Sequence, residues 1–209
     1  MAKIYDITLN ICNGMVTYPG DPEPGILEHK LISGGDNCNL SMISLGSHTG
    51  THVDAPRHFY ANGLSIDEMS LDYFIGSARL IEIPANKDKV TSRDLADFEI
   101  KKDERLILKT RNSEIISKGY FDKNFVYLTE DAASYLAGIK IKTLGFDYLS
   151  VEKYNSKCHA VHKILLKENI PIIEGLVLKN IKQGNYHLVA LPLKLDACDG
   201  SPVRAVLVG

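Results

Sequence analysis

The sequence feature that most constrains this chain is a run of potential metal-ligand side chains between residues 48 and 58, which reads HTGTHVDAPRH. This short run holds three of the seven histidines in the chain. Its threonines, glycine, valine and proline are poor helix formers, so an extended conformation is expected. Side chains alternate between the two faces of an extended segment, which places four even-numbered side chains on one face: His48, His52, Asp54 and His58.

A straight run of this length would spread its donor groups over about 33 Å, too far for one ion to collect them. His52 and Asp54 lie only ~7 Å apart at their Cα atoms and can meet at one point. Gly50 and Pro56 are positions where the chain can bend. We therefore predict a curved segment whose imidazole and carboxylate groups face one centre. The alternative, a polar turn with hydrogen-bonded histidines, explains the clustering less well.

A metal centre built on one segment usually needs ligands from elsewhere. His159 and His162 stand three apart at the start of an expected helix, and either could contribute. Glu174 ends an apolar run, where a carboxylate is costly to bury unless it is paired or bound to a metal. A set of nitrogen and oxygen donors suits zinc, manganese or iron.

Composition excludes several classes of function. The net charge of −2 at pH 7 argues against a nucleic-acid surface. No apolar stretch reaches the ~20 residues of a membrane-spanning helix, and Asp6 interrupts the place where a signal peptide would be apolar. We expect a cytoplasmic protein with no membrane or nucleic-acid partner. The four cysteines form no CxxC pair and are expected to be free thiols.

The periodicity predicts a single domain over residues 1–209 with mixed α/β structure. Turn-forming residues dominate the first forty positions. Helices are expected after caps at Thr91 or Ser92 and at Thr129, the latter ending just before Gly138, and again over residues 162–169. Strands are expected at residues 41–45, 79–83, 106–109, 143–149, 171–173, 187–193 and 203–208.

The stretch from His48 to Phe59 resembles the signature of the metal-dependent cyclase-like hydrolase family, which includes bacterial kynurenine formamidases and isatin hydrolases. The similarity continues in order along the chain, through Tyr5–Thr8, Tyr18–Asp21, Leu144–Ser150, His162–Leu166, Ile170–Leu176, Leu191–Lys194 and Asp199–Ala205. Two places depart from the family pattern: Ala160 stands where relatives have proline, and Thr110 is followed by Arg-Asn in place of glycine and an aromatic residue.

The resemblance implies a swivelling β/β/α fold with a mixed sheet and a centre of one or two metal ions, zinc or alternatively manganese. It implies that His48, His52 and Asp54 are ligands, that Asp54 can bridge two ions, and that the second ligand region supplies Glu174 and, through its HxxLL match, His162. Asp54 would also hold charge and geometry during catalysis. His58 would be the general acid/base.

The resemblance further implies a metal-dependent amidohydrolase that acts on a small-molecule amide. The expected reaction is hydrolysis of the aryl formamide N-formylkynurenine to kynurenine and formate, a step of tryptophan catabolism. The alternatives are hydrolysis of another cyclic amide or lactone such as isatin, a metal-containing binding protein with little catalysis, and a structural domain with incidental histidines. Tyr18, Phe59 and Tyr60 are candidate substrate contacts. The family also implies a homodimer or homotetramer.

Overall fold

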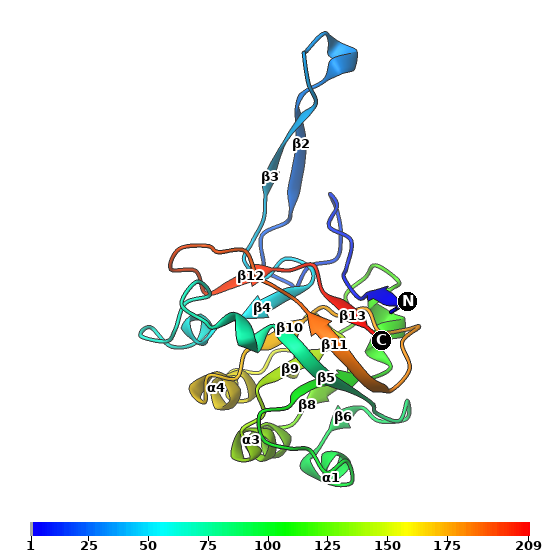
Figure 1. Ribbon diagram of the computed structural model, residues 1–209, viewed down its shortest axis with the longest axis vertical. Helices are drawn as coiled ribbons and strands as arrows, with labels where there is room; N and C mark the ends of the chain where they lie inside the picture. Colours follow the sequence, from blue (N-terminus) through cyan, green and yellow to red (C-terminus); the bar gives the residue numbers. More distant parts are fainter. Residues whose placement is uncertain (1) are drawn as a thin grey trace.

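The computed structural model of the chain describes residues 2–209, which are organised around a nine-stranded mixed sheet with the order β1-β13-β11-β5-β7-β9-β10-β4-β12 (Figure 1). The strands β5, β7, β9 and β10 run parallel, and the others pair antiparallel. The bounds of the sheet strands are β1 (Ile4–Asp6), β4 (His52–Asp54), β5 (Ile75–Glu82), β7 (Arg105–Lys109), β9 (Thr143–Phe146), β10 (Ile172–Glu174), β11 (Gly184–Val189), β12 (Gly200–Pro202) and β13 (Val206–Val208). This arrangement confirms the predicted mixed α/β class.

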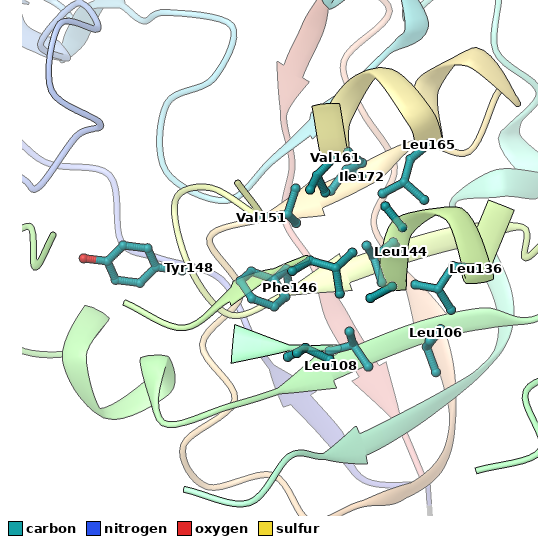
Figure 2. Close-up of a cluster of buried hydrophobic side chains, with 14 of the residues drawn as sticks. Leu106, Leu108, Leu136, Leu144, Phe146, Tyr148, Val151, Val161, Leu165 and Ile172 are labelled. Atoms are coloured by element: carbon teal, nitrogen blue, oxygen red, sulfur yellow. The ribbon is translucent and has the colours of Figure 1, made fainter. Parts of the chain in front are cut away.

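The central parallel strands are apolar on both faces, as strands covered on both sides must be. In β7, Leu106 and Leu108 join one buried cluster, whereas Ile107 between them joins the cluster on the opposite face. Figure 2 shows the first cluster, where Leu136 and Leu165 reach from two helices toward the sheet. The helices are α1 (Ser92–Ala96), α2 (Asn112–Ile116), α3 (Glu130–Ile139) and α4 (Ala160–Lys167).

The starts of α1 and α3 follow the capping signals in the sequence. Thr91 accepts a hydrogen bond from the Asp94 backbone, and the Asp94 carboxylate accepts one from the Thr91 backbone, which together form a capping box before α1. Thr129 precedes α3, although its hydroxyl donates to the Val90 carbonyl. No helix within residues 2–209 is long and apolar enough to cross a membrane.

The end of α3 corrects a prediction. Gly138 was expected just beyond the helix, but α3 continues through Ile139 and is closed by Lys140 in the left-handed conformation, with φ of 62°. The Lys140 amide donates to the carbonyls of Leu136 and Ala137. The chain must deliver Ile141, which is 3% exposed, into the core directly afterwards, and this requirement overrides the preference for a terminal glycine.

Two small sheets complete the fold. A two-stranded parallel sheet joins β6 (Lys89–Val90) to β8 (Tyr127–Leu128). A hairpin of β2 (Gly25–Lys30) and β3 (Leu40–Ser44) projects from the body of the molecule (Figure 1), and we call residues 25–44 the arm. Strand β3 lies within one residue of the expected strand, but β2 falls in a region for which only turns were predicted.

Candidate metal centre

The core of the site is β4, which lies between β10 and β12 and pairs antiparallel with both. His52 and Asp54 point to one face of this strand, as alternation requires, and Val53 points to the other face and is fully buried in the core. The register places His52 directly opposite Glu174 of β10. Two segments more than a hundred residues apart therefore bring imidazole and carboxylate groups together.

The chain bends on both sides of β4 at the predicted places. Gly50 has φ of 68°, and its carbonyl oxygen lies 3.0 Å from Nδ1 of His52. After β4, Pro56 begins the 3-10 helix η2 (Pro56–His58). Gly175 follows β10 with φ of 70°, and a Cβ there would lie 2.3 Å from the Gly50 oxygen, so only glycine fits this crossing of two loops.

Three histidines each place one ring nitrogen close to the carboxylate of Asp54 or of Glu174. His48 Nδ1 lies 2.8 Å and His52 Nε2 lies 3.2 Å from Oδ1 of Asp54. On the other side, His162 Nε2 lies 3.3 Å from Oε1 of Glu174, and His52 Nε2 lies 3.5 Å from Oε2. The side chains of His52, Asp54, His162 and Glu174 are all 6% exposed or less. We call the five residues His48, His52, Asp54, His162 and Glu174 the donor cluster.

Each of the three histidines turns its other ring nitrogen toward an oxygen outside the donor cluster. His48 Nε2 lies 2.9 Å from Oδ2 of Asp199, and His162 Nδ1 lies 3.0 Å from Oε2 of Glu152. For His52 the partner is the Gly50 carbonyl. A carboxylate or carbonyl in this position is the usual companion of a metal-bound imidazole, because it fixes the tautomer and the ring orientation.

Sequence reasoning missed Glu152 and Asp199 as functional residues. Glu152 follows the family-like stretch 144–150 by two residues, and Asp199 begins the stretch 199–205, so both lie in or beside segments that had been noticed. No histidine stands near Asp199 in the sequence, and its contact with His48 spans 151 positions.

The pKa shifts in the donor cluster show that its carboxylates stabilise positive charge on the three histidines. For His52, burial lowers the pKa, but hydrogen bonds to Asp54 and Glu174 raise it further, to about 10. His162 reaches about 10, with its partners Glu152 and Glu174 outweighing burial, and His48 reaches about 9. Burial opposes ionisation of Asp54, but His48 and His52 hold its pKa well below the ordinary value.

The donor cluster fits a divalent cation. Oδ2 of Asp54 is buried and has no hydrogen-bond partner among the described residues, which is costly for a carboxylate oxygen. The nearest charged donor is His162 Nε2, at 3.7 Å. His52, Asp54 and Glu174 each offer a ligand atom within 4.8 Å of the others, and so do His48, Asp54 and His58. Neutral imidazole with carboxylate is a donor set suited to zinc or manganese.

His58 differs from the other histidines of the site. Its side chain is 29% exposed, its ring lies 4.0 Å from the ring of His48, and its Nδ1 lies 3.4 Å from Oδ2 of Asp199. His58 thus lies at the border between the donor cluster and solvent. A side chain in this place can reach both a bound substrate and bulk water.

The structure separates the two histidines between which the sequence left a choice. His162 lies in the first turn of α4, is buried, and faces Glu174 and Asp54. His159 is exposed at the N-terminal end of α4 with φ of 48°, and its ring lies 5.2 Å from the ring of Phe59.

A cavity of about 310 Å³ opens above the donor cluster. Tyr18 and Phe59 line it together with two residues of opposite charge, Asp21 and Lys153. Tyr60 was expected to contact substrate but does not line this cavity; the turn of η2 directs it to α4, where its hydroxyl donates to the Lys163 carbonyl over 2.9 Å.

The chain is similar to known proteins along most of its length. A family model described as "Putative cyclase" matches residues 5–153. The chain is 34% identical over 202 residues to a protein of Bacillus cereus described as kynurenine formamidase, covering 97% of this chain and 95% of that one. A relative of the same name from Bacillus anthracis is 34% identical over 208 residues, covering 99% and 97%.

Solved structures give the same picture. A structure described as a predicted metal-dependent hydrolase from Bacillus stearothermophilus is 34% identical, with a TM-score of 0.87, covering 100% of this chain and 98% of that one. The isatin hydrolase A of Labrenzia aggregata has a TM-score of 0.86 at 21% identity, covering 99% and 93%. At that identity the likeness concerns the fold.

Proposed function

The chain belongs to the cyclase family of metal-dependent hydrolases, and on this premise we propose that it hydrolyses N-formylkynurenine to kynurenine and formate. As its relatives indicate, it is a metal-dependent amidohydrolase. The observation that carries the proposal is the buried donor cluster at the floor of a cavity with aromatic and charged walls.

Asp54 divides the proposed ligands into two sets. Its Oδ1 faces His48 and His52, whereas its Oδ2 faces His162, which in turn contacts Glu174. This division supports a centre of one or two ions, which His48, His52, Asp54, His162 and Glu174 would hold, with Asp54 shared between the two sets of ligands. We propose zinc as the native metal and manganese as the alternative.

The proposed mechanism assigns a separate task to each group of residues. A bound divalent cation supplies Lewis acidity, which lowers the pKa of water and polarises a carbonyl oxygen. Water adds to the formyl carbon as one of its protons passes to His58, and Asp54 and Glu174 hold the charge and the geometry of the centre. His58 then donates this proton to the anilide nitrogen as the C–N bond breaks, so that the amine leaves neutral, and the formic acid that forms releases its remaining proton to solvent as formate.

The walls of the cavity support an amino-acid substrate. Tyr18 packs edge-on against Phe121 with 5.3 Å between ring centroids, and Phe59 lies 5.1 Å from the ring of His162, so aromatic surface is available for an aryl group. Lys153 and Asp21 add one positive and one negative charge. This pair complements the carboxylate and ammonium groups that N-formylkynurenine carries and isatin lacks.

The decisive experiment is an assay of the dialysed chain reloaded with zinc or with manganese, on N-formylkynurenine and on isatin, with the metal content measured alongside. We expect stoichiometric metal and release of formate from N-formylkynurenine. If the metal is fully bound and only isatin is hydrolysed, the substrate class would be cyclic amides and not aryl formamides. Full metal binding with no hydrolysis of either compound would favour a binding protein.

Substitution of Lys153 tests the substrate more finely. Lys153→Met should lower kcat/KM for N-formylkynurenine about tenfold, the effect of one lost charge-assisted contact. The same variant should keep its rate on formanilide, which has no carboxylate. Equal losses on both compounds would show that Lys153 does not recognise the amino-acid group.

A further inference from the structure

His159 is exposed to solvent and also lines the cavity above the donor cluster. Its ring lies 5.2 Å from the ring of Phe59, and the ring of Phe59 lies 5.1 Å from that of His162. All three residues line the cavity, and Phe59 packs against both histidines. Because His162 is buried and His159 is exposed, the three rings form an aromatic surface that leads from the donor cluster to solvent.

The side chain of His159 does not perform the task that is common at its position. His159 is the N-cap of α4, where a side chain normally accepts a hydrogen bond from the first turn, but it makes no such bond within residues 2–209. Glu152 takes this role instead, because its Oε2 accepts from the Val161 amide over 3.1 Å and from the His162 amide over 3.4 Å. The imidazole of His159 is therefore available for a contact in the cavity.

The backbone of His159 adopts a conformation that few residues other than glycine adopt. Its φ of 48° and ψ of 43° lie in the left-handed region. Residues in this region persist where the surrounding structure holds them, and they gather at binding sites. In this conformation a ring nitrogen of His159 lies within 4.8 Å of a ring nitrogen of His162 and of a carboxylate oxygen of Glu152. The imidazole therefore stays beside the cavity although it is exposed.

The next residue, Ala160, permits this conformation. It is one of the two positions at which the chain departs from the family pattern, which has proline there. A proline disfavours helical backbone in the residue before it and pushes that residue to an extended conformation. With alanine at position 160, His159 can be left-handed and can place its ring against Phe59. The residues at 159 and 160 are therefore two parts of one arrangement.

We propose that His159 is a specificity-determining residue, which contacts the aryl ring of a formamide substrate and extends the aromatic wall formed by Phe59. The inference rests on the proposed function, because it concerns the substrate of the same centre. Aromatic faces attract a second aromatic ring beyond the simple burial of apolar surface, so this wall favours aryl over alkyl formamides. At the mouth of the cavity, His159 contributes to the binding of substrate and not to the breaking of the C–N bond.

Steady-state kinetics of the zinc-loaded chain on formanilide test this contact. His159→Ala should raise KM about three- to tenfold, the loss of one aromatic contact. The kcat should stay near the wild-type value, because the contact is the same in the bound substrate and in the transition state. His159→Phe keeps an aromatic ring and should restore the wild-type KM. An unchanged KM in His159→Ala, or no restoration in His159→Phe, would overturn the proposal.

Ala160 provides a test that leaves the His159 side chain in place. Ala160→Pro should raise KM as His159→Ala does, because proline is well tolerated in the first turn of a helix but pushes residue 159 to extended backbone. Ala160→Ser imposes no such restriction and is the matched control, with an expected wild-type KM. A wild-type KM in Ala160→Pro would contradict the dependence of the His159 contact on the backbone conformation.

Metal content distinguishes a substrate contact from a metal ligand. The zinc content of His159→Ala should equal that of the wild-type chain, because His159 lies outside the donor cluster. Loss of zinc would make His159 a ligand and overturn the proposal.

Calorimetric titration of the zinc-loaded chains with kynurenine requires no turnover, so it separates this proposal from the proposed function. If the wild-type chain hydrolyses no formamide but binds kynurenine more tightly than His159→Ala does, the proposed function fails and the aryl contact stands. If formamides are hydrolysed and both chains bind kynurenine equally, the aryl contact fails alone.

Discussion

The donor cluster and the arm both depart from the ordinary distribution of side chains. The donor cluster buries charged side chains, and the arm exposes apolar ones. In the donor cluster, charged groups such as Asp54 and Glu174 are 1% and 3% exposed, whereas in the arm Ile43 is 62% exposed. Burying charge and exposing apolar surface are both unfavourable in an isolated chain. A bound cation would offset the cost of the buried charges in the cluster.

The two regions also differ in how they are held. The donor cluster is built on β4 and β10 inside the large sheet and on α4, which packs against that sheet. The arm is attached to the body only at its base. Substitutions in the cluster are therefore expected to act on chemistry at one defined centre.

The largest effect is expected from removing one proposed metal ligand of the donor cluster. His52→Ala leaves Asp54 and Glu174 buried beside each other without their shared imidazole, so metal content and hydrolytic activity should be lost together. Elemental analysis and the formamide assay measure both. His187→Ala removes an exposed histidine of β11 and should change neither. Full activity in His52→Ala would refute the ligand assignment.

His58 should separate proton transfer from metal binding. His58→Ala should retain most of its metal, because this side chain stands at the solvent border, while kcat falls by roughly 100-fold or more. The metal stoichiometry and the steady-state rate, measured on the same sample, distinguish a role of His58 in proton transfer from a role in metal binding. An unchanged kcat would assign the proton transfer to another group, and loss of metal would make His58 a ligand.

A smaller effect is expected from the outer carboxylate that holds His162. Glu152→Gln weakens the contact with Nδ1 of His162 without emptying the site, so metal affinity should fall about 10- to 100-fold. Competition with a chelator measures this change. Glu168→Gln, at the exposed end of the same helix, is the matched control and should keep the wild-type affinity.

The smallest expected effect concerns the chain stripped of metal. The pKa of His52 rises from the ordinary 6.5 to about 10 on folding, and that of His48 to about 9, so the folded chain binds more protons than the unfolded chain within this range. Its free energy of unfolding should therefore fall as pH rises from 6.5 toward 10. Thermal unfolding should show a decrease of several degrees. A melting temperature that rises over this range would contradict the charge balance described for the cluster.

Much of the donor cluster could be predicted because its first half is local. The alternation of a strand and the bends at Gly50 and Pro56 follow from the residue types themselves, so the direction of His52 and Asp54 was accessible from the sequence. Glu152 and Asp199 were not, because they meet His162 and His48 only through tertiary packing.

The arm and the end of α3 show a different limit of sequence reasoning. Strand β2 reads Gly-Ile-Leu-Glu-His-Lys, which lacks the alternation of a half-buried strand because neither of its faces rests on the core. Similarly, Gly138 looks like a helix terminus, yet the place where Ile141 must enter the core decides where α3 ends.

The pairing of His52 with Glu174 has a consequence for how this molecule can fail. A one-residue slip between β4 and β10 would turn His52 and Asp54 toward the packed apolar interior and bring Val53 out of it. A chain with this misaligned register would bury unpaired charge. It would therefore be unstable and would not accumulate as a folded but inactive protein. Variants with an insertion or deletion in these two strands should therefore fail to fold and be degraded. Changes of length in the turns that connect more distant strands should be tolerated.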